Sequence, residues 1–428
     1  MEIMFILFGL MLLLVLINVP IAVSLGVVAT GAMVVSYGVD SLPNMAIVMF
    51  NGATKFPLLA IPLFILAGAI MNSSGISSRL INLASALFSW IRGGLAHVSI
   101  GVSLFFAEIS GSAVADVAAL GSVLIPEMKR KGYSGAFAAA VTSSSASLAI
   151  IIPPSIPMIL YAVMSESSVI ELFVAGIVPG LLGGIGLMFA AHFYAVRNNL
   201  PAEDKFSWGR VRVAAREAGW ALTLPMIILG GIFGGVVTAT EGAALAVVAA
   251  LFIGTVIYGE LNISHLKSAV LEGGIQTAVV MLMVSTSALL GSYLTEAGAP
   301  QQMAAAVAAF TSDPVLVLMF LNLIFLFLGV FLHSAAAIIL VVPIVMPLVL
   351  SVGIDPVHFG IIVTLNLAIG QQTPPVASVL MVASSIAKTS VWEVTRVNVI
   401  FIGVLMAVLL LVTYVPFVGM GLVEYFYR

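Results

Sequence analysis

Two polar stretches interrupt long apolar segments of this sequence, and each ends in consecutive prolines. The first runs from Thr142 to Pro154 and holds four serines ahead of the prolines, and the second runs from Gly370 to Pro375. Consecutive prolines remove two amide donors and oppose a continuous helix. The freed carbonyls, with Ser and Thr hydroxyls, are hard oxygen ligands of the kind that a dehydrated small cation needs, whereas exposed helix N-termini favour an anion.

Two further polar breaks, from Ser110 to Ser112 and from Leu332 to Ser334, each divide an apolar segment into two short arms. One broken helix facing one hairpin turn, in two copies, predicts two cation sites that flank a central anion site. The first cation site is assigned to Ser110, Gly111, Ser112, Ala149, Ile152 and Pro154, and the second to Leu332, His333, Ser334, Gly370, Thr373 and Pro375, mostly through backbone carbonyls. The side chains expected at the anion are those of Ser112, Asp116, Ser144, Ser145, Ser147, Gln371 and Gln372. Pro153 and Pro374 have the structural role of fixing the breaks.

Few ionisable side chains accompany these stretches. Asp116 follows the first turn, where a lone carboxylate in lipid costs about 2.5 to 3.5 kcal/mol on insertion scales, so we expect it to face a cavity. There it either acts with the cation site or hydrogen-bonds a neighbouring helix. Glu241 is expected to cap the helix that begins beside it. Glu108 is expected on the wall of the first hairpin and Glu127 at the cytoplasmic mouth of that hairpin. His333 is expected to be structural rather than a proton relay.

The composition places these elements in a membrane. Hydrophobic residues make up 62% of the 428-residue chain and charged residues only 8%, far from the balance of a soluble domain. Apolar runs long enough to span hydrocarbon recur along the whole chain, and the first one is read as retained spans rather than a signal peptide. The chain contains no Cys, which excludes disulfides and thiolate sites.

Basic residues fall in clusters that define one side of the membrane. The main cluster runs from Arg197 to Arg216, and the segments from Gly132 to Val196 and from Ser268 to Ala387 contain no Lys or Arg. Cytoplasmic loops carry the Lys and Arg excess, so we take the clustered side as cytoplasmic. Lys55 and Arg428 are the exceptions.

The two halves of the sequence match each other at a constant offset of 221 residues. The matching residues are Tyr37-Gly38 with Tyr258-Gly259, Pro126 with Pro347, Gly132 with Gly353, and Pro153-Pro154 with Pro374-Pro375. Each proline pair alone is more simply a kink whose gap Ser residues cap. The duplication favours the functional interpretation, because symmetry-related broken helices are typical of transporters.

The charge clusters give the second copy the opposite orientation, because an odd number of crossings separates the two hairpins. The fold class is therefore an all-α polytopic membrane protein with two inverted-topology repeats, each holding a re-entrant helical hairpin and a discontinuous helix. The predicted units are residues 1–196, with a hairpin over 94–128 and a broken helix over 132–164; a cytoplasmic linker over 197–216; and residues 217–428, with a hairpin over 314–350 and a broken helix over 357–387.

Conventional enzyme motifs are absent from the sequence. It has no His-Glu-x-x-His segment for zinc, no nucleophile-elbow serine and no Gly-Lys pair for a phosphate loop. The sequence therefore predicts a protein that is not an enzyme and does not use ATP itself.

Three segments resemble the large membrane subunit of tripartite ATP-independent periplasmic (TRAP) transporters. They run from Gly234 to Glu241, from Ile152 to Ser155 and from Gln372 to Val376, and the resemblance extends over essentially the whole chain. Ala239 stands where that family commonly has Pro, and Gln371 with Gln372 precedes the second proline pair as a further departure.

The resemblance implies a multi-pass protein of the bacterial inner membrane that works as a sodium-driven elevator. It implies two or more Na⁺ sites, a small membrane subunit of about four spans, and a periplasmic binding protein that delivers an organic acid anion. The serine run favours the sialic acid branch over C4-dicarboxylates. A self-sufficient sodium and anion symporter remains an alternative, as does an intramembrane enzyme or scaffold.

Overall fold

The computed structural model describes residues 2–17, 19–110, 112–202, 205–308 and 310–428. This part of the chain is helical throughout and contains no strand. The helices of the first half are α1 (Glu2–Leu16), α2 (Ile21–Tyr37), α3 (Leu42–Ala53), α4 (Ala60–Ser73), α5 (Ile76–Phe88), α6 (Gly94–Ser110), α7 (Ala113–Arg130), α8 (Gly135–Ala146), α9 (Ile156–Ser165) and α10 (Val169–Arg197). Those of the second half are α11 (Trp208–Glu217), α12 (Gly219–Phe233), α13 (Ala239–Phe252), α14 (Ile263–Glu296), α15 (Ala299–Ala308), α16 (Pro314–Phe331), α17 (Ser334–Ser351), α18 (Pro356–Gly370), α19 (Ser378–Ala387), α20 (Val391–Tyr414) and α21 (Pro416–Tyr427).

Seven helices in the described residues are long and apolar enough to cross a bilayer. They include α10 with 29 residues and α14 with 34. At about 1.5 Å per residue, both exceed the roughly 30 Å of hydrocarbon. The all-helical polytopic architecture expected from the composition is therefore confirmed.

Helical hairpins form where the polar breaks lie. The side chain of Ser112 accepts a hydrogen bond from the amide of Ala115 and so starts α7 after α6. In the same way, Nδ1 of His333 accepts from the amide of Ala335, 3.4 Å away, and starts α17 after α16. Both caps satisfy amides that the first turn of a helix leaves without a partner.

Both proline pairs interrupt a helix. After α8, a 3₁₀ turn (Ser147–Ile150) and an extended segment lead into α9. After α18, the chain passes through Pro374 and Pro375 before α19 begins at Ser378. The Pro153-Pro154 and Pro374-Pro375 peptide bonds are both cis.

The broken helices occupy the centre of the molecule. Every residue of α18 from Val357 to Gly370 is buried, as is every residue of α8 from Phe137 to Ala146. Helices α16 and α18 approach closely at two glycines, because a Cβ atom built on Gly370 would lie 2.5 Å from the Cα atom of Gly329. This contact leaves no room for a side chain.

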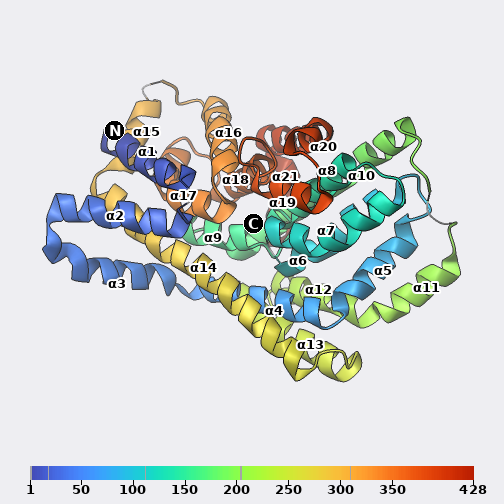
Figure 1. Ribbon diagram of the computed structural model, residues 1–428. Coiled ribbons are helices and arrows are strands. Elements are labelled where there is room, and N and C mark those ends of the chain that lie inside the picture. Colours follow the sequence, from blue (N-terminus) through green and yellow to red (C-terminus); the bar gives the residue numbers. More distant parts are fainter. Residues whose placement is uncertain (1, 18, 111, 203–204, 309) are drawn as a thin grey trace.

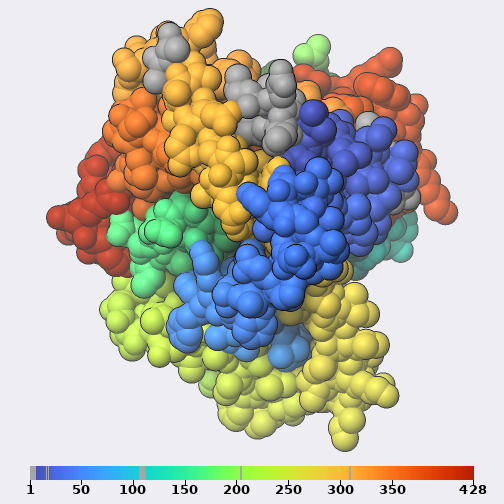
Figure 2. Space-filling model, turned by 90° about the vertical axis from the view of Figure 1, so that its left-hand side faces the viewer, coloured from blue at the N-terminus to red at the C-terminus, as the bar shows by residue number. Residues whose placement is uncertain are grey.

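The packing interleaves the two halves of the chain. The arm α7 packs against α8 of its own half and against α19 of the other, while α17 packs against α9. Figure 1 shows α14 as a long diagonal helix beside α2 and α3, and it also packs against α4 and α17. In Figure 2 the N-terminal helices, in blue, lie across one face of the molecule, above the yellow and lime segments.

Candidate functional site

A cavity of about 410 Å³ brings the two hairpin turns together. Ser112 lines it from the start of α7 and His333 from the start of α17, although 221 residues separate them in the chain. Ile156 and Pro157 of α9 form a further part of the wall, as do Ile65 of α4 and five residues of α14: Ile275, Gln276, Val279, Val280 and Met283.

Three helix N-termini meet at this cavity. Its lining includes first-turn residues of α7 (Val114 and Ala115), of α9 (Ile156 and Pro157) and of α17 (Ala335). Each N-terminus carries partial positive charge and amides that point along the helix axis. No Lys or Arg of the described residues lines the cavity. An anion held here would therefore be bound by backbone dipoles and hydroxyls rather than by a formal charge.

A second cavity of about 350 Å³ adjoins the first and shares Ile65, Ala115, Ala118 and Gln276 with it. Asp116 and Glu272 both line it. The Asp116 side chain is buried, with 1% of its surface exposed, and Nε2 of Gln276 donates to Oε1 of Glu272 over 3.3 Å. Two ionised carboxylates at one cavity disfavour an anion and favour a cation by Coulomb interaction.

Ser144 and Gln372 lie in a buried cluster away from both cavities. The Ser144 hydroxyl lies 2.6 Å from Oε1 of Gln372 and 2.7 Å from Oδ1 of Asn398. Nδ2 of Asn398 also donates to Oε1 of Gln372 over 3.3 Å, and all three residues are fully buried. The sequence predicts Ser144 and Gln372 at the anion, and that role stays a prediction; in the structure their hydrogen bonds connect α8 to the end of α18 and to α20.

The hydroxyls of Ser145 and Ser147 also form hydrogen bonds with other groups of the protein. Ser103 of α6 donates to the hydroxyl of Ser145 over 3.0 Å, and Ser145 donates to the carbonyl of Thr142 over 3.1 Å. The Ser147 hydroxyl donates to the carbonyl of Ser143 over 3.1 Å. The serine run therefore ties the first arm of the hairpin to α8.

Gln371 differs from the other predicted anion ligands in its surroundings. It is 1% exposed, and among the described residues neither Nε2 nor Oε1 has a partner. Earlier in α18, Oδ1 of Asn366 is also buried and has no partner in the described part of the chain, while its Nδ2 donates to Oδ1 of Asn322 over 2.6 Å. Buried polar atoms of this kind call for a water or an ion, which makes the end of α18 a candidate ligand site.

The predicted cation ligands are spread over both breaks. Ala149, Ile152 and Pro154 are buried around the first break, where Ser155 donates to the carbonyl of Ile150 over 2.8 Å. The Ser110 side chain and Gly111 lie outside the described residues.

Around the second break, Leu332, Ser334 and Gly370 are buried, whereas Pro375 is exposed. The Thr373 hydroxyl donates to the carbonyl of Ile369 over 3.0 Å. The described residues contain no cluster of three His, Asp or Glu side chains suited to a metal ion, so a cation here would rest on carbonyls and amides.

Glu241 and Glu127, which lie outside the cavities, have structural partners. Glu241 forms a capping box with Thr238: its carboxylate accepts from the Thr238 amide over 2.8 Å, and the Thr238 hydroxyl accepts from the Glu241 amide. Glu127 pairs with Arg130 at the end of α7. The side chain of Glu108 lies outside the described residues.

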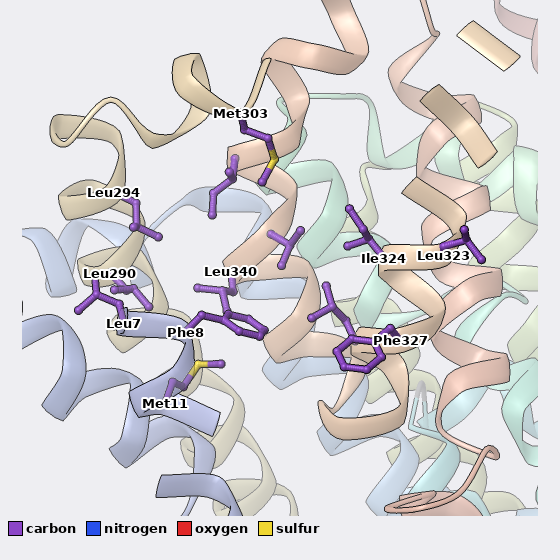
Figure 3. A pocket seen from close by; sticks show the side chains of 13 residues that line it. Leu7, Phe8, Met11, Leu290, Leu294, Met303, Leu323, Ile324, Phe327 and Leu340 are labelled. Carbon is purple, nitrogen blue, oxygen red and sulfur yellow. The ribbon is translucent and has the colours of Figure 1, made fainter. Parts of the chain in front are cut away.

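A cavity of about 390 Å³ elsewhere has the opposite chemistry. Leu7, Phe8 and Met11 of α1 face Leu340 of α17 and Phe327 of α16 across it (Figure 3). The described side chains of its wall offer hydrocarbon and sulfur only, so they provide no oxygen ligand for an ion.

Sequence reasoning missed several of these residues. Glu272 and Gln276 of α14, Asn398 of α20, and Ser99 and Ser103 of α6 lie in segments without a proline break or a matching repeat. A polar side chain within an apolar helix is the signal that points to them, because such residues cost free energy in lipid unless they are paired.

Comparison with known proteins gives a consistent picture. The family described as "Tripartite ATP-independent periplasmic transporter, DctM component" matches residues 8–418. The isethionate TRAP transporter permease DctMQ of Oleidesulfovibrio alaskensis is 40% identical over 416 residues, which cover 97% of this chain but only 65% of that relative. The C4-dicarboxylate permease DctM of Vibrio cholerae is 37% identical and covers 94% of both chains, and the sialic acid permease SiaM of the same species is 40% identical, covering 81% and 82%.

Among solved structures, the YdaH transporter of Alcanivorax borkumensis has a similar fold. The TM-score is 0.65 with 90% of each chain covered, at 14% sequence identity. At this identity the likeness concerns the fold alone.

Proposed function

This chain belongs to the DctM family of tripartite ATP-independent periplasmic transporters, as a multi-pass large permease of the bacterial inner membrane, and on that premise we propose that it imports an organic acid anion together with Na⁺. The observation that carries the proposal is the meeting of three helix N-termini at the cavity between Ser112 and His333. A carboxylate bound there gains from three helix dipoles in a water-poor environment.

Sodium coupling is supported by a carboxylate beside that cavity and by amide groups at the end of α18. Asp116 lines the adjoining cavity, and Gln371 and Asn366 offer buried amide oxygens that have no partner among the described residues. Bound cations would neutralise the carboxylate and order the breaks, so that the anion site forms only when Na⁺ is present. We propose that the residues around the two helix breaks, at Pro154 and Pro375, provide the Na⁺ ligands.

An elevator movement is supported by the position of the cavity. The hairpin arms α7 and α17 and the helix α9, which follows the first break, line it together with α4 and α14. The hairpins and broken helices would move as one unit that carries the anion and Na⁺ past α4 and α14. The two inverted repeats predicted from the sequence would supply matching routes from either side of the membrane.

The partners follow from the family. A small membrane subunit and a periplasmic binding protein would complete the importer, the binding protein delivering the substrate. Relatives named for isethionate, C4-dicarboxylates and sialic acid share 37 to 40% identity with this chain, so identity does not choose among them. We propose sialic acid as the first substrate to test, with C4-dicarboxylates next.

The test is uptake of radiolabelled sialic acid into proteoliposomes that hold this chain with its small subunit. Uptake is expected only with both the binding protein and an inward Na⁺ gradient. Uptake that continues unchanged without the gradient would overturn the sodium coupling. Sodium-driven uptake without the binding protein would favour the self-sufficient symporter.

A direct test of the cation proposal is thermal stability in NaCl against choline chloride. The wild-type chain is expected to melt at a higher temperature in NaCl, and Gln371→Leu is expected to lose part of that difference. Gln301→Leu, on the exposed surface of α15, is the control and should keep it. Equal melting temperatures of the wild type in the two salts would contradict the Na⁺ sites.

A further inference from the structure

The segment joining the two halves ends in a short helix with an unusual surface. Helix α11 meets α12 at a bend of 62°, so α11 turns away from the direction in which α12 enters the membrane. Val211 and Ala214 are buried, and α11 packs against α5. The remaining face of α11 is exposed, which is typical of a helix that lies in the membrane interface.

Trp208, Arg212 and Arg216 form a stripe on that exposed face. Their spacing of four residues places them one above another on a helix, and Trp208 is 75% exposed. Among the described residues no carboxylate forms an ion pair with Arg212 or Arg216. The two guanidinium groups therefore present positive charge that no acidic side chain of the described chain neutralises.

An aromatic cluster continues the stripe. The ring of Phe206 contacts those of Trp90 and Trp208 edge to face, with centroids 5.5 and 5.2 Å apart. Trp90 and Phe206 are 45% and 43% exposed. Exposed Trp rings beside basic residues are characteristic of the level of lipid headgroups, where the apolar ring and the polar nitrogen are both satisfied.

A polar cavity of about 440 Å³ lies between α5 and α11. Asn82 and Ser85 line it from α5, and Gly209, Arg210 and Glu217 line it from α11. Amide, hydroxyl and guanidinium donors suit the oxygens of a phosphate, and the carboxylate of Glu217 suits a hydroxyl of a headgroup. Arg210 and Glu217 line the cavity and are themselves exposed, so the cavity opens onto the surface of α11 beside the stripe.

We propose that this surface, formed by Trp90, Phe206, Trp208, Arg212 and Arg216 together with the cavity that Arg210 lines, is a binding site for an anionic glycerophospholipid. The phosphate would lie against Arg212 and Arg216 and the headgroup would extend toward the cavity, while the Trp rings contact the glycerol and upper acyl region. Charge complementarity selects an anionic lipid over a zwitterionic one. A bound lipid would hold α11, and with it the join between the two halves, at the membrane surface.

The test uses the purified full chain in a mild detergent, with phosphatidylglycerol or phosphatidylcholine titrated and bound lipid counted by native mass spectrometry. The wild type is expected to retain phosphatidylglycerol preferentially. The double variant Arg212→Gln/Arg216→Gln should weaken the first phosphatidylglycerol by roughly fivefold for each arginine removed. The variant Arg212→Lys/Arg216→Lys should keep most of the affinity.

The matched control is Lys267→Gln/Arg396→Gln, which removes two exposed basic side chains elsewhere in the chain and should leave the binding of the first lipid unchanged. Melting temperatures in lipid-free detergent check that all variants fold. Phosphatidylglycerol binding that is equal in the wild type and the Gln variant, or lowered equally by the control, would overturn the proposal.

A second readout remains available if the arginine variant fails to fold. In proteoliposomes, phosphatidylglycerol with brominated chains should quench tryptophan fluorescence more than brominated phosphatidylcholine at the same mole fraction. Trp208→Phe should reduce this difference, and Trp392→Phe, an exposed residue of α20, should not. Equal quenching by the two lipids would count against an anionic lipid site. None of these measurements depends on uptake.

Discussion

Ser144 of α8 and Gln372, which follows α18, share a buried hydrogen bond of 2.6 Å although 228 residues separate them. Asn398 of α20 completes the cluster, lying 2.7 Å from the same hydroxyl. This cluster joins the two broken helices to each other and to a long membrane-spanning helix. It therefore fixes the relative position of the two breaks on which the proposed ion sites depend.

Removal of one member should leave buried partners without hydrogen bonds. Asn398→Ala is expected to cost about 1 to 3 kcal/mol, the penalty of an unsatisfied buried polar group, and to lower the melting temperature. Ser122→Ala is the control, because Ser122 is exposed and bonds only its own helix at Ala119. An Asn398 variant as stable as the control would show that the cluster contributes nothing to the fold.

The contact between α16 and α18 should tolerate no side chain. Gly370→Ala would place its Cβ atom 2.5 Å from the Cα atom of Gly329, and overpacking of this kind costs about 1 to 3 kcal/mol. Gly274→Ala is the control, since a Cβ atom there has no neighbour within 4 Å. Thermal unfolding in detergent measures both, and equal melting temperatures would contradict the close approach.

A bulky side chain in the cavity between Ser112 and His333 should stop transport without unfolding the protein. Val114 lines the cavity from the first turn of α7, so Val114→Trp is expected to lower uptake about tenfold or more, as a loss of about 1.4 kcal/mol or more in binding would. Val123→Trp on the same helix is the control, because Val123 is 56% exposed and lies outside the cavity. Normal uptake by Val114→Trp would remove the cavity from the transport route.

The ion pair of Asp355 with Arg428 should make stability depend on pH. Partial burial opposes ionisation of Asp355, but hydrogen bonds from Arg428 and from the amides of His358 and Val357 outweigh it and hold its pKa below the ordinary value. A carboxyl whose pKa is lowered on folding stabilises the protein above its unfolded pKa of about 3.9 and loses that contribution as the pH falls through the folded pKa.

We therefore expect the melting temperature of Asp355→Asn to lie below that of the wild type at neutral pH. This difference in melting temperature should close as the pH falls below about 4. The amide keeps the cap on α18, so the comparison isolates the charge. Asp313→Asn is the control, because Asp313 also caps a helix that begins with proline and forms no ion pair among the described residues. A gap that persists in acid would mean that the ion pair is not its cause.

Much of the local architecture could be predicted from the sequence, because its causes are local. Proline pairs at Pro153 and Pro374 remove amide donors and end helices whatever surrounds them, and Thr238 followed by Glu241 suits a capping box from spacing alone. Apolar runs too long for a soluble core predicted the membrane spans, and the motifs around them pointed to the family that residues 8–418 match.

The partners of individual side chains were decided only by tertiary packing. The serine run predicted a ligand site, yet Ser144 and Ser145 bond Gln372 and Ser103, because a buried hydroxyl takes the nearest partner that the packed helices offer. Gln276 of α14 lines the same cavity as the hairpin turns, and three helix N-termini also line it. Neither relation can be predicted from the periodicity of the sequence. These relations join segments from 42 to 228 residues apart, so they follow from how whole helices pack and not from the pattern within any one of them.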